Sequence, residues 1–503
     1  MALSYGSLAL YATAFTFIYY FLLGIYNVFF HPLRHYPGPL LWRASPLPKN
    51  IYMLRGLYAK KAREIHETYQ GTVRVAPNEL SYIQRKPAPP NPVRLQTSTG
   101  RPLKSEMYKD MRFFGGDAFG RDSLVTTLPE DHTRMRRIFS HAFSNTALKA
   151  QEPLLVKYAD QMVDTMGALA SRNDARAVNI VDLFNFCTFD VMADLTFGEP
   201  LLLLERGDYH PWVHGLFSGL KYVIYGVVLL EFPVLGPLCE RVLAAPMKRA
   251  AQDHMDFAGA LVDRRLAQKD HPKPDIWSFV VKHQGDEKGL SDREMHANAA
   301  MFMVAGTETT ATVLSGVAYY LLRNPAVHAR LTAEIRGAFA RTEDINTDRL
   351  VQLEYLNGVL MEGLRIYNPG GSGMPRIVPE GGAEICGEFI PGGTWVSVNP
   401  YVAFSHPDNW ARPTEFLPER WIHPDDPEWR DDKREVHEPF SYGPRNCLGK
   451  NLAWLELRLM LAKTLWHYDL ELCPGMEKWV DQKSYLTWEK GPLMVKLIPV
   501  KRD

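Results

Sequence analysis

The longest apolar run stands at the start of the chain. Residues 1–30 carry no charged side chain, and positions 8–30 are almost wholly apolar or aromatic. A helix of ~20 residues at ~1.5 Å each crosses a hydrocarbon layer of ~30 Å, so the run is long enough to span a membrane. We expect residues 1–30 to be a membrane anchor. A cleaved secretory signal is the alternative, disfavoured because the run has no basic start and no A-x-A site follows.

The segment after this run predicts how the anchor is oriented. Arg34, Arg43 and Lys49 follow it and no positive side chain precedes it, so the positive-inside rule places the rest of the chain in the cytosol. Three prolines within residues 31–39 prevent a helix and predict an extended connector. The connector is either a strap that holds the body against the bilayer or a plain linker.

The pattern in the rest of the chain is mainly helical. Ser291 and Glu294 form a capping-box pattern, and nothing breaks the helix after it before Asn324-Pro325, about 30 residues later. Two further helices are expected over residues 353–367 and 449–466. Glycine and proline punctuate short apolar pieces over residues 379–400, which indicates small strands, and residues 86–102 have the composition of a loop. The fold class is therefore mainly α with a small β portion.

Composition excludes several classes of protein. The 57 basic side chains equal the 57 acidic ones, whereas a general nucleic-acid binder needs a basic excess, so no nucleic-acid partner is expected. With 46% hydrophobic residues the chain can bury a large core, which argues against disorder. Five cysteines show no C-x-x-C spacing, which disfavours a zinc ribbon or a disulfide scaffold and favours a reducing compartment.

One of these cysteines lies in a distinctive ten-residue stretch, F-S-Y-G-P-R-N-C-L-G, over residues 440–449. A thiolate is a metal ligand only if its charge is stabilised, and backbone N–H groups of a glycine turn and a following helix N-terminus can do this for Cys447. Gly443 permits the turn, and Gly449 lets the helix approach a flat cofactor. Phe440 can shield the sulfur, and Arg445 can pair with a carboxylate. A lone cysteine near a helix start is usually only a small buried residue, but here the whole spacing F-x-x-G-x-R-x-C-x-G is met.

This stretch resembles the heme-binding signature of the cytochrome P450 family, and the likeness extends from the anchor to the carboxyl terminus. It is most similar to fungal microsomal members of secondary metabolism. The resemblance implies a cytochrome P450 fold behind one transmembrane helix, in the endoplasmic reticulum membrane. It also implies heme b (iron protoporphyrin IX) with Cys447 as the axial thiolate ligand of its iron, and an electron-rich sulfur that favours O–O cleavage of dioxygen.

A second motif, A-G-T-E-T, occupies residues 305–309 in the middle of the long expected helix. The Thr309 hydroxyl can bond back to the Ala305 carbonyl and loosen the helix locally, and Gly306 lets the backbone approach the cofactor face. An ordinary exposed Glu-Thr pair is the alternative. The resemblance assigns Glu308 and Thr309 to oxygen activation, which consumes two protons that a hydroxyl beside a carboxylate can relay.

Further charged residues are explained by the same resemblance. Glu362 and Arg365 share a helix face, and such a pair alone contributes only ~0.2–0.5 kcal/mol when exposed. In the family, the arginine of a segment like P-E-R-W joins that pair. Glu362, Arg365 and Arg420 would then form a buried structural triad under the heme-binding loop.

The two heme propionates need cations or strong donors, because burying unpaired charge is costly. The candidates are His132 and Arg136, spaced i, i+4 on an expected helix, together with Arg376 and Arg445. Tryptophan is common in the family at the first position of the helical pair, and His132 departs from this. For any one of the arginines alone, a solvated surface position is the alternative.

Largely uncharged segments are expected to line the substrate pocket, which predicts a small apolar or aromatic natural product. They are residues 113–114, 216–228, 298–304, 369–374 and 485–486. Gly370, Gly371 and Gly373 stand where bulkier residues are frequent in the family, which predicts room above the heme. The alternatives are that an apolar stripe is core, and that residues 216–235 dip into the membrane.

No flavin domain is fused, so electrons are expected from a separate NADPH-dependent cytochrome P450 reductase, docked near Lys450 and Arg458 unless these form a solvated helix face. Three functions compete. The first is a monooxygenase that inserts an oxygen atom from dioxygen into its substrate. The second is a heme-thiolate enzyme that couples, cyclises or desaturates without net insertion. The third is a non-catalytic membrane heme-binding protein, disfavoured because binding needs no proton relay.

Overall fold

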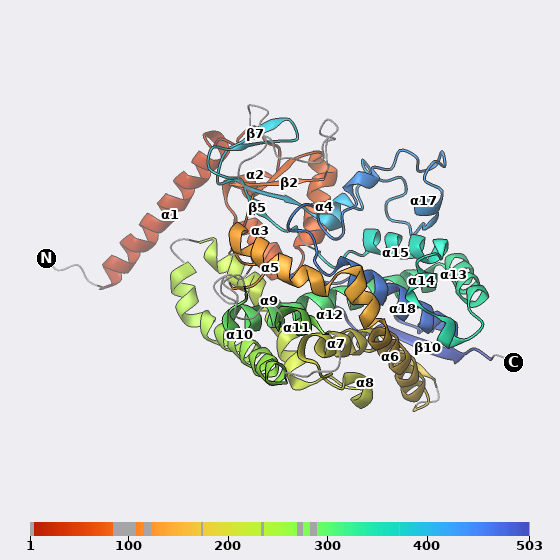
Figure 1. Ribbon diagram of the computed structural model, residues 1–503. Coiled ribbons are helices and arrows are strands. Elements are labelled where there is room, and N and C mark those ends of the chain that lie inside the picture. The colour runs from red at the N-terminus through yellow and green to blue at the C-terminus, as the bar shows by residue number, and fades with distance from the viewer. Residues whose placement is uncertain are drawn as a thin grey trace. The chain divides into compact units, whose positions relative to one another are not determined.

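The computed structural model in Figure 1 describes residues 5–83, 107–111, 113–114, 122–172, 175–232, 236–268, 275–281, 289–371 and 373–501. The expected loop over residues 86–102 lies outside the described residues. The chain divides into two compact units, one of Met1–Asp110 with Ser372–His406 and one of Met111–Gly371 with Pro407–Asp503.

The first unit is built on a five-stranded sheet in the order β1-β2-β8-β5-β3. Strands β2 and β8 are parallel, and the other pairs are antiparallel. The strands of this unit are β1 (Val73–Ala76), β2 (Glu79–Tyr82), β3 (Tyr108–Lys109), β5 (Arg376–Ile377), β8 (Trp395–Val398) and the hairpin β6 (Ala383–Ile385) with β7 (Glu388–Ile390). Its helices are α1 (Tyr5–Phe29), α2 (Leu40–Ala44), α3 (Leu47–Leu54), α4 (Tyr58–Tyr69) and α16 (Pro400–Ala403). The small strands predicted over residues 379–400 are confirmed.

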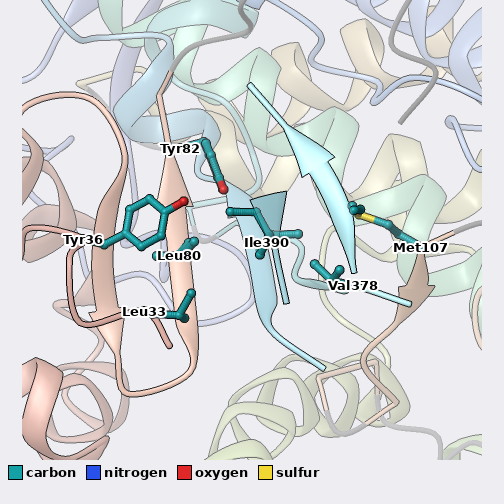
Figure 2. Close-up of a cluster of buried hydrophobic side chains, with 9 residues drawn as sticks. Leu33, Tyr36, Leu80, Tyr82, Met107, Val378 and Ile390 are labelled. Atoms are coloured by element: carbon teal, nitrogen blue, oxygen red, sulfur yellow. The ribbon is translucent and has the colours of Figure 1, made fainter. Parts of the chain in front are cut away.

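The proline-rich segment after α1 is neither a plain linker nor an extended connector over its first part. Residues 32–35 form turns, in which the Arg34 N–H donates to the His31 carbonyl at 2.9 Å. Leu33 and Tyr36 are buried in a hydrophobic cluster with side chains of the sheet such as Leu80, as Figure 2 shows. The segment turns because both side chains must reach the same cluster, and this contact binds it to the sheet.

The anchor expectation rests on α1, which is long and apolar enough to cross a membrane and has no buried residue in its most apolar window. Its end contacts α2, where the Asn27 amide donates to the Ala44 carbonyl at 2.9 Å. Lys49, one of the three positive charges expected beside the membrane, is instead buried and ion-paired with Glu79 at 2.7 Å. A second helical segment, Pro211–Leu229, is also long and apolar enough to cross a membrane, but 31% of its most apolar window is buried in the protein.

The second unit is mainly helical. Its helices are α5 (Pro129–Ala142), α6 (Asn145–Ala170), α7 (Ile180–Phe197), α8 (Leu203–Arg206), α9 (Pro211–Leu230), α10 (Gly236–Ala267), α11 (Ile276–Val280), α12 (Asp292–Arg323), α13 (Pro325–Ala338), α14 (Thr347–Leu350), α15 (Glu354–Ile366), α17 (Glu419–Ile422) and α18 (Lys450–His467), with the 3₁₀ turns η2 (Thr342–Asp344) and η3 (Arg434–Val436). A three-stranded sheet in the order β4-β10-β9 joins β4 (Ala177–Asn179), β10 (Met494–Pro499) and β9 (Tyr468–Leu472).

The long helix α12 organises this unit. Ser291 and Glu294 form the predicted capping box, each side chain accepting from the other residue's backbone N–H. The helix ends before Asn324, because the residue preceding a proline disfavours the helical conformation. Helix α12 packs against α7, α10, α15 and α18, and Figure 1 shows it in green among them. The helices predicted over residues 353–367 and from Gly449 to Trp466 are confirmed as α15 and α18.

Candidate active site

The loop before α18 closes on itself around Cys447. The Cys447 N–H donates to the Phe440 carbonyl at 2.8 Å, and the Asn446 N–H donates to the Gly443 carbonyl at 3.0 Å. Gly443 has φ +83°, a backbone conformation that side chains other than glycine rarely adopt. The glycine therefore forms the predicted turn, and the two backbone hydrogen bonds close the loop at the cysteine.

The environment of Cys447 is mixed. Cys447 is an exposed residue, although enough protein lies around its sulfur to desolvate the thiolate. This burial raises the pKa of the thiol, while the Gly449 N–H and the charges of Arg136 and Lys450 oppose the rise. A side chain added at Gly449 would meet no atom within 4 Å. A thiol with cationic neighbours and open space beside it suits a flat, electron-accepting metal cofactor.

Cations gather beside this loop, as predicted for the propionates. Arg136 on α5 donates to the Asn446 carbonyl at 2.7 Å and also to its side-chain oxygen. Arg445 donates to the Thr127 carbonyl at 3.1 Å. Burial lowers the pKa of Arg136, and the nearby charge of Arg445 lowers it further, against the effect of Cys447. Among the described residues no carboxylate is ion-paired with Arg136, so two neighbouring guanidinium groups provide a site that an anionic cofactor fits.

The other two propionate candidates are placed less directly. His132 is buried on α5, one turn before Arg136, as the i, i+4 spacing predicted. Arg376 lies in β5 and belongs to the other compact unit. A role for either residue at a propionate stays a prediction.

The A-G-T-E-T motif lies in the middle of α12. The Thr309 hydroxyl donates to the Ala305 carbonyl at 2.7 Å, which is the predicted back-bond, and Ala305 itself is exposed. At Gly306 an added Cβ would meet the Met192 sulfur of α7 at 2.6 Å. The missing side chain therefore serves the close packing of α7 on α12, and an approach of this backbone to the cofactor stays a prediction.

Glu308 has partners that local sequence did not indicate. Its carboxylate is buried and ion-paired with Lys490, whose ammonium also donates to the Thr312 hydroxyl at 2.7 Å. The Thr309 hydroxyl lies with Ala305, and no hydrogen bond to Glu308 is seen from it among the described residues. The alternative of an exposed Glu-Thr pair is wrong for Glu308, because the side chain is 5% exposed.

The predicted charged triad comes together, fully buried. Glu362 and Arg365 share two hydrogen bonds of 2.7 and 2.8 Å, and Arg420 approaches Glu362 at 3.3 Å. Burial alone would raise the pKa of Glu362, but Arg365 and Arg420 hold it below its usual value. Asp432, which local sequence did not indicate, pairs with the other side of Arg420. The support of this cluster for the cysteine loop stays a prediction.

Most of residues 298–304, which were expected to line the substrate pocket, belong to the protein core instead. Asn298 is wholly buried, its Oδ1 accepts from the Leu124 N–H at 2.8 Å, and its amide donates to the Glu294 carbonyl at 2.7 Å. Phe302 packs edge-on against Phe139 in the core. Within residues 298–304 only positions 301 and 304 are partly exposed. The rest of the stretch is core because α5, α10 and the loop at Leu124 contact α12 along that length.

The room expected at the glycines of residues 370–373 is filled at Gly371 and Gly373. A Cβ on Gly371 would come within 1.9 Å of the Ser484 hydroxyl oxygen, and one on Gly373 within 3.0 Å of the Val398 carbonyl. The missing side chains admit neighbouring protein atoms rather than leaving space. Phe113 is buried and Phe114 is partly exposed, with their rings edge-to-face at 5.3 Å.

Comparison with known proteins agrees with this geometry. The Cytochrome P450 family model matches residues 103–497. The chain is 40% identical over 487 residues to cytochrome P450 monooxygenase efuB of Hormonema carpetanum, covering 96% of this chain and 95% of that protein. It is 40% identical over 476 residues to cytochrome P450 monooxygenase astJ of Aspergillus oryzae (94% of each) and 38% identical over 494 residues to cytochrome P450 monooxygenase FUM2 of Gibberella moniliformis (95% and 100%).

The chain belongs to the cytochrome P450 family. It is therefore an oxidoreductase of the P450 monooxygenase class, and membership implies a heme iron. The predicted fold and the resemblance to fungal members are confirmed. Asn446, Asp432 and Lys490 were missed by sequence reasoning. Asn446 stands inside the cysteine motif and carried a local signal, whereas Lys490 lies 182 positions from Glu308 and carried none.

Proposed function

We propose that this chain is a membrane-anchored heme-thiolate monooxygenase that hydroxylates, epoxidises or similarly oxidises a small, largely apolar natural product in a secondary-metabolite pathway. The observation that carries the proposal is Cys447, an exposed residue just before the start of α18 whose thiol has Arg136 as a cationic neighbour, with open space at Gly449. The names of the fungal relatives support the monooxygenase class.

The proposed cofactor is heme b, which when bound supplies the iron that activates dioxygen. Cys447 would hold it through the sulfur, with Phe440 at the loop's other end. Arg136 and Arg445, with His132 and Arg376 as further candidates, would neutralise its two carboxylates. The Gly449 N–H and the start of α18 stabilise negative charge on the sulfur, because a helix N-terminus carries partial positive charge.

Proton supply is the proposed task of α12. Glu308 is a buried carboxylate and Thr309 a partly exposed hydroxyl one residue later, in the same helix turn. A carboxylate exchanges protons readily near neutral pH, and a hydroxyl both accepts and donates one. The back-bond of Thr309 to Ala305 orients its oxygen along the helix.

The proposed location is the endoplasmic reticulum membrane, crossed once by residues 1–30, with residues 31–503 as the catalytic domain in the cytosol. The apolar window of α1, which has no buried residue, supports this proposal. Arg34 and Arg43 supply positive charge after the span, whereas Lys49 is paired with Glu79 inside the folded unit.

The proposed electron donor is an NADPH–cytochrome P450 reductase that docks near the start of α18. Lys450 is exposed there, with its ammonium 5.9 Å from the Phe440 ring. Arg458 is held inward by a 2.8 Å hydrogen bond to Asn357 and by the Trp454 ring at 4.7 Å. Lys450 is therefore the better docking charge of the two.

In the deciding experiment, purified protein, reductase, NADPH and ¹⁸O-labelled dioxygen are incubated with extracts of related metabolites as candidate substrates. The products are then detected by mass spectrometry. Label in a product supports the monooxygenase, and an oxidised product without label supports coupling, ring formation or desaturation. A protein that binds heme but turns over nothing supports the non-catalytic alternative. Cys447→Ser should abolish the carbon monoxide difference spectrum that is typical of a thiolate-ligated heme. An unchanged spectrum would show that Cys447 is not the ligand.

A further inference from the structure

The ion pair between Glu308 and Lys490 lies inside the protein. The two side chains are 5% and 3% exposed, so water screens neither charge. The Lys490 ammonium donates to the Thr312 hydroxyl at 2.7 Å, and that hydroxyl lies 3.4 Å from Glu308 Oε1. The other oxygen, Oε2, is buried and has no hydrogen-bond partner among the described residues. The carboxylate is thus hydrogen-bonded through Oε1, while Oε2 is buried without a described partner.

The segment that carries Lys490 is firmly held. The Trp488 indole N–H donates to the Asn368 carbonyl at 2.7 Å, and its ring is buried. The Glu489 N–H donates to the Lys483 carbonyl at 2.8 Å, and the Leu493 N–H donates to the Asn179 side chain at 2.9 Å. Lys490 therefore reaches α12 from a fixed backbone, which makes it suited to positioning another side chain.

Among the described residues, Lys490 is the cation that forms an ion pair with Glu308. Among the described residues, the phenols of Tyr209 and Tyr367 also interact electrostatically with Glu308, and burial is the first cause that raises the pKa of each. Both phenols stay neutral and cannot balance a negative charge. A buried carboxylate without a counter-charge takes up a proton instead of staying ionised.

We propose that Lys490 is a positioning residue for the relay carboxylate: it keeps Glu308 ionised inside the protein and holds Oε1 against Thr312, so that Oε2 is the oxygen available for proton exchange. The inference rests on the proposed function, because it assumes that Glu308 relays protons. It adds a residue from the carboxyl-terminal loop to a site otherwise built on α12.

The charge state is tested by infrared spectroscopy of the full chain in detergent at neutral pH, which requires neither substrate nor reductase. Lys490→Met should produce a protonated-carboxyl band in addition to the one that buried Glu456 gives in every variant at this pH, and the double variant with Glu308→Gln should lose the added band. Wild type, Lys490→Arg and Lys496→Met should lack the added band. Lys496 is the matched control, because its pair with Glu471 at 3.2 Å is exposed. Absence of the added band in Lys490→Met would overturn the proposal. Lys490→Gln replaces that variant if it does not accumulate in folded form.

The relay role is tested by peroxide release with purified reductase, NADPH and air, without added substrate. One NADPH reduces dioxygen to hydrogen peroxide, whereas two NADPH with two protons reduce it to two waters, so weaker proton delivery raises peroxide per NADPH. Glu308→Gln and Lys490→Met should both raise this ratio, and the double variant should not exceed Glu308→Gln, because Lys490 acts through that carboxylate. Lys490→Arg should restore the wild-type ratio and Lys496→Met should leave it unchanged.

The outcomes separate the two proposals. No rise in Glu308→Gln removes the relay from the proposed function, whatever Lys490 does. A rise in Glu308→Gln without one in Lys490→Met, or a double variant well above Glu308→Gln, overturns the role of Lys490 and leaves the relay intact.

Discussion

The guanidinium of Arg136 donates two hydrogen bonds to Asn446, one to its backbone carbonyl at 2.7 Å and one to its side-chain oxygen. Asn446 immediately precedes Cys447, so a single side chain of α5 holds the loop that presents the thiol. The same guanidinium influences the thiol through its charge. Arg136 therefore links loop geometry and sulfur electrostatics, in addition to its proposed contact with a propionate.

Arg136→Ala should lower heme retention strongly. Hydrogen bonds to charged groups contribute ~1.5–3 kcal/mol each, so the loss corresponds to about tenfold or more in heme affinity. Heme retention in Arg136→Lys should lie between that of wild type and that of Arg136→Ala, since one ammonium cannot make both hydrogen bonds in the same geometry. The measurement is heme absorbance per protein after gel filtration. Arg137→Ala, an exposed neighbour on α5, is the control and should match wild type. Equal retention in both alanine variants would contradict the role of Arg136.

Thr309→Ala should retain heme and its carbon monoxide difference spectrum, but it should form much less product per NADPH consumed than wild type. The methyl group cannot relay a proton, and a general acid contributes ~10²-fold or more to such steps. The measurement is product formed per NADPH consumed. Thr309→Ser keeps the hydroxyl and should recover most of the coupling. Coupling equal to wild type in Thr309→Ala would remove the threonine from the relay.

Glu456 on α18 should make stability fall as pH rises. Burial raises the pKa of this carboxyl group from its usual 4.5 to about 8, against a hydrogen bond from Thr310, and its Oε1 has no described partner. The folded state then holds a proton that the unfolded state releases above pH ~4.5. The stabilisation is complete below that pH and is lost as pH rises to about 8, on the order of 3 kcal/mol between pH 5 and 8.

Glu456→Gln keeps the shape and cannot ionise, so its urea midpoint should decline less than that of wild type over this pH window. Glu343→Gln, at an exposed position, should follow wild type. Parallel pH profiles for wild type and Glu456→Gln would show that the buried carboxyl does not titrate in this window.

A variant lacking residues 1–30 should move from the membrane pellet to the supernatant and keep its fold. The exposed apolar window of α1 is removed, whereas Leu33 and Tyr36 remain in their cluster (Figure 2). Leu33→Ala in the full chain should instead stay in the membrane and lose ~2–5 kcal/mol of stability, the cost of a buried leucine cavity. The measurements are fractionation and chemical unfolding. Complete retention of the shortened variant in the pellet would assign membrane binding to another segment, with α9 next to be tested.

Features set by neighbours along the chain were predictable. The apolar run, the capping box of Ser291 and Glu294, and the turn at Gly443 each depend on residues a few positions apart, and the structure contains all three. The back-bond from Thr309 to Ala305 follows from helix geometry alone. The cysteine motif indicated the family because all the residues of the heme-binding signature lie within ten consecutive positions.

Features set by packing were not predictable in the same way. Gly371 leaves no room because Ser484 fills the space, and Gly306 accommodates Met192 of another helix. Lys49 follows the apolar helix α1 in sequence, yet it is buried against Glu79. In each case the deciding atom comes from a distant segment.

The sequence by itself therefore determined the apolar amino-terminal helix, the helical class, the thiolate ligand candidate and the family of this protein, because hydrogen bonds and hydropathy act over short separations. Only the tertiary structure decided which charges meet. Glu308 and Lys490 lie 182 positions apart, and a buried charge selects its partner by desolvation and distance in space.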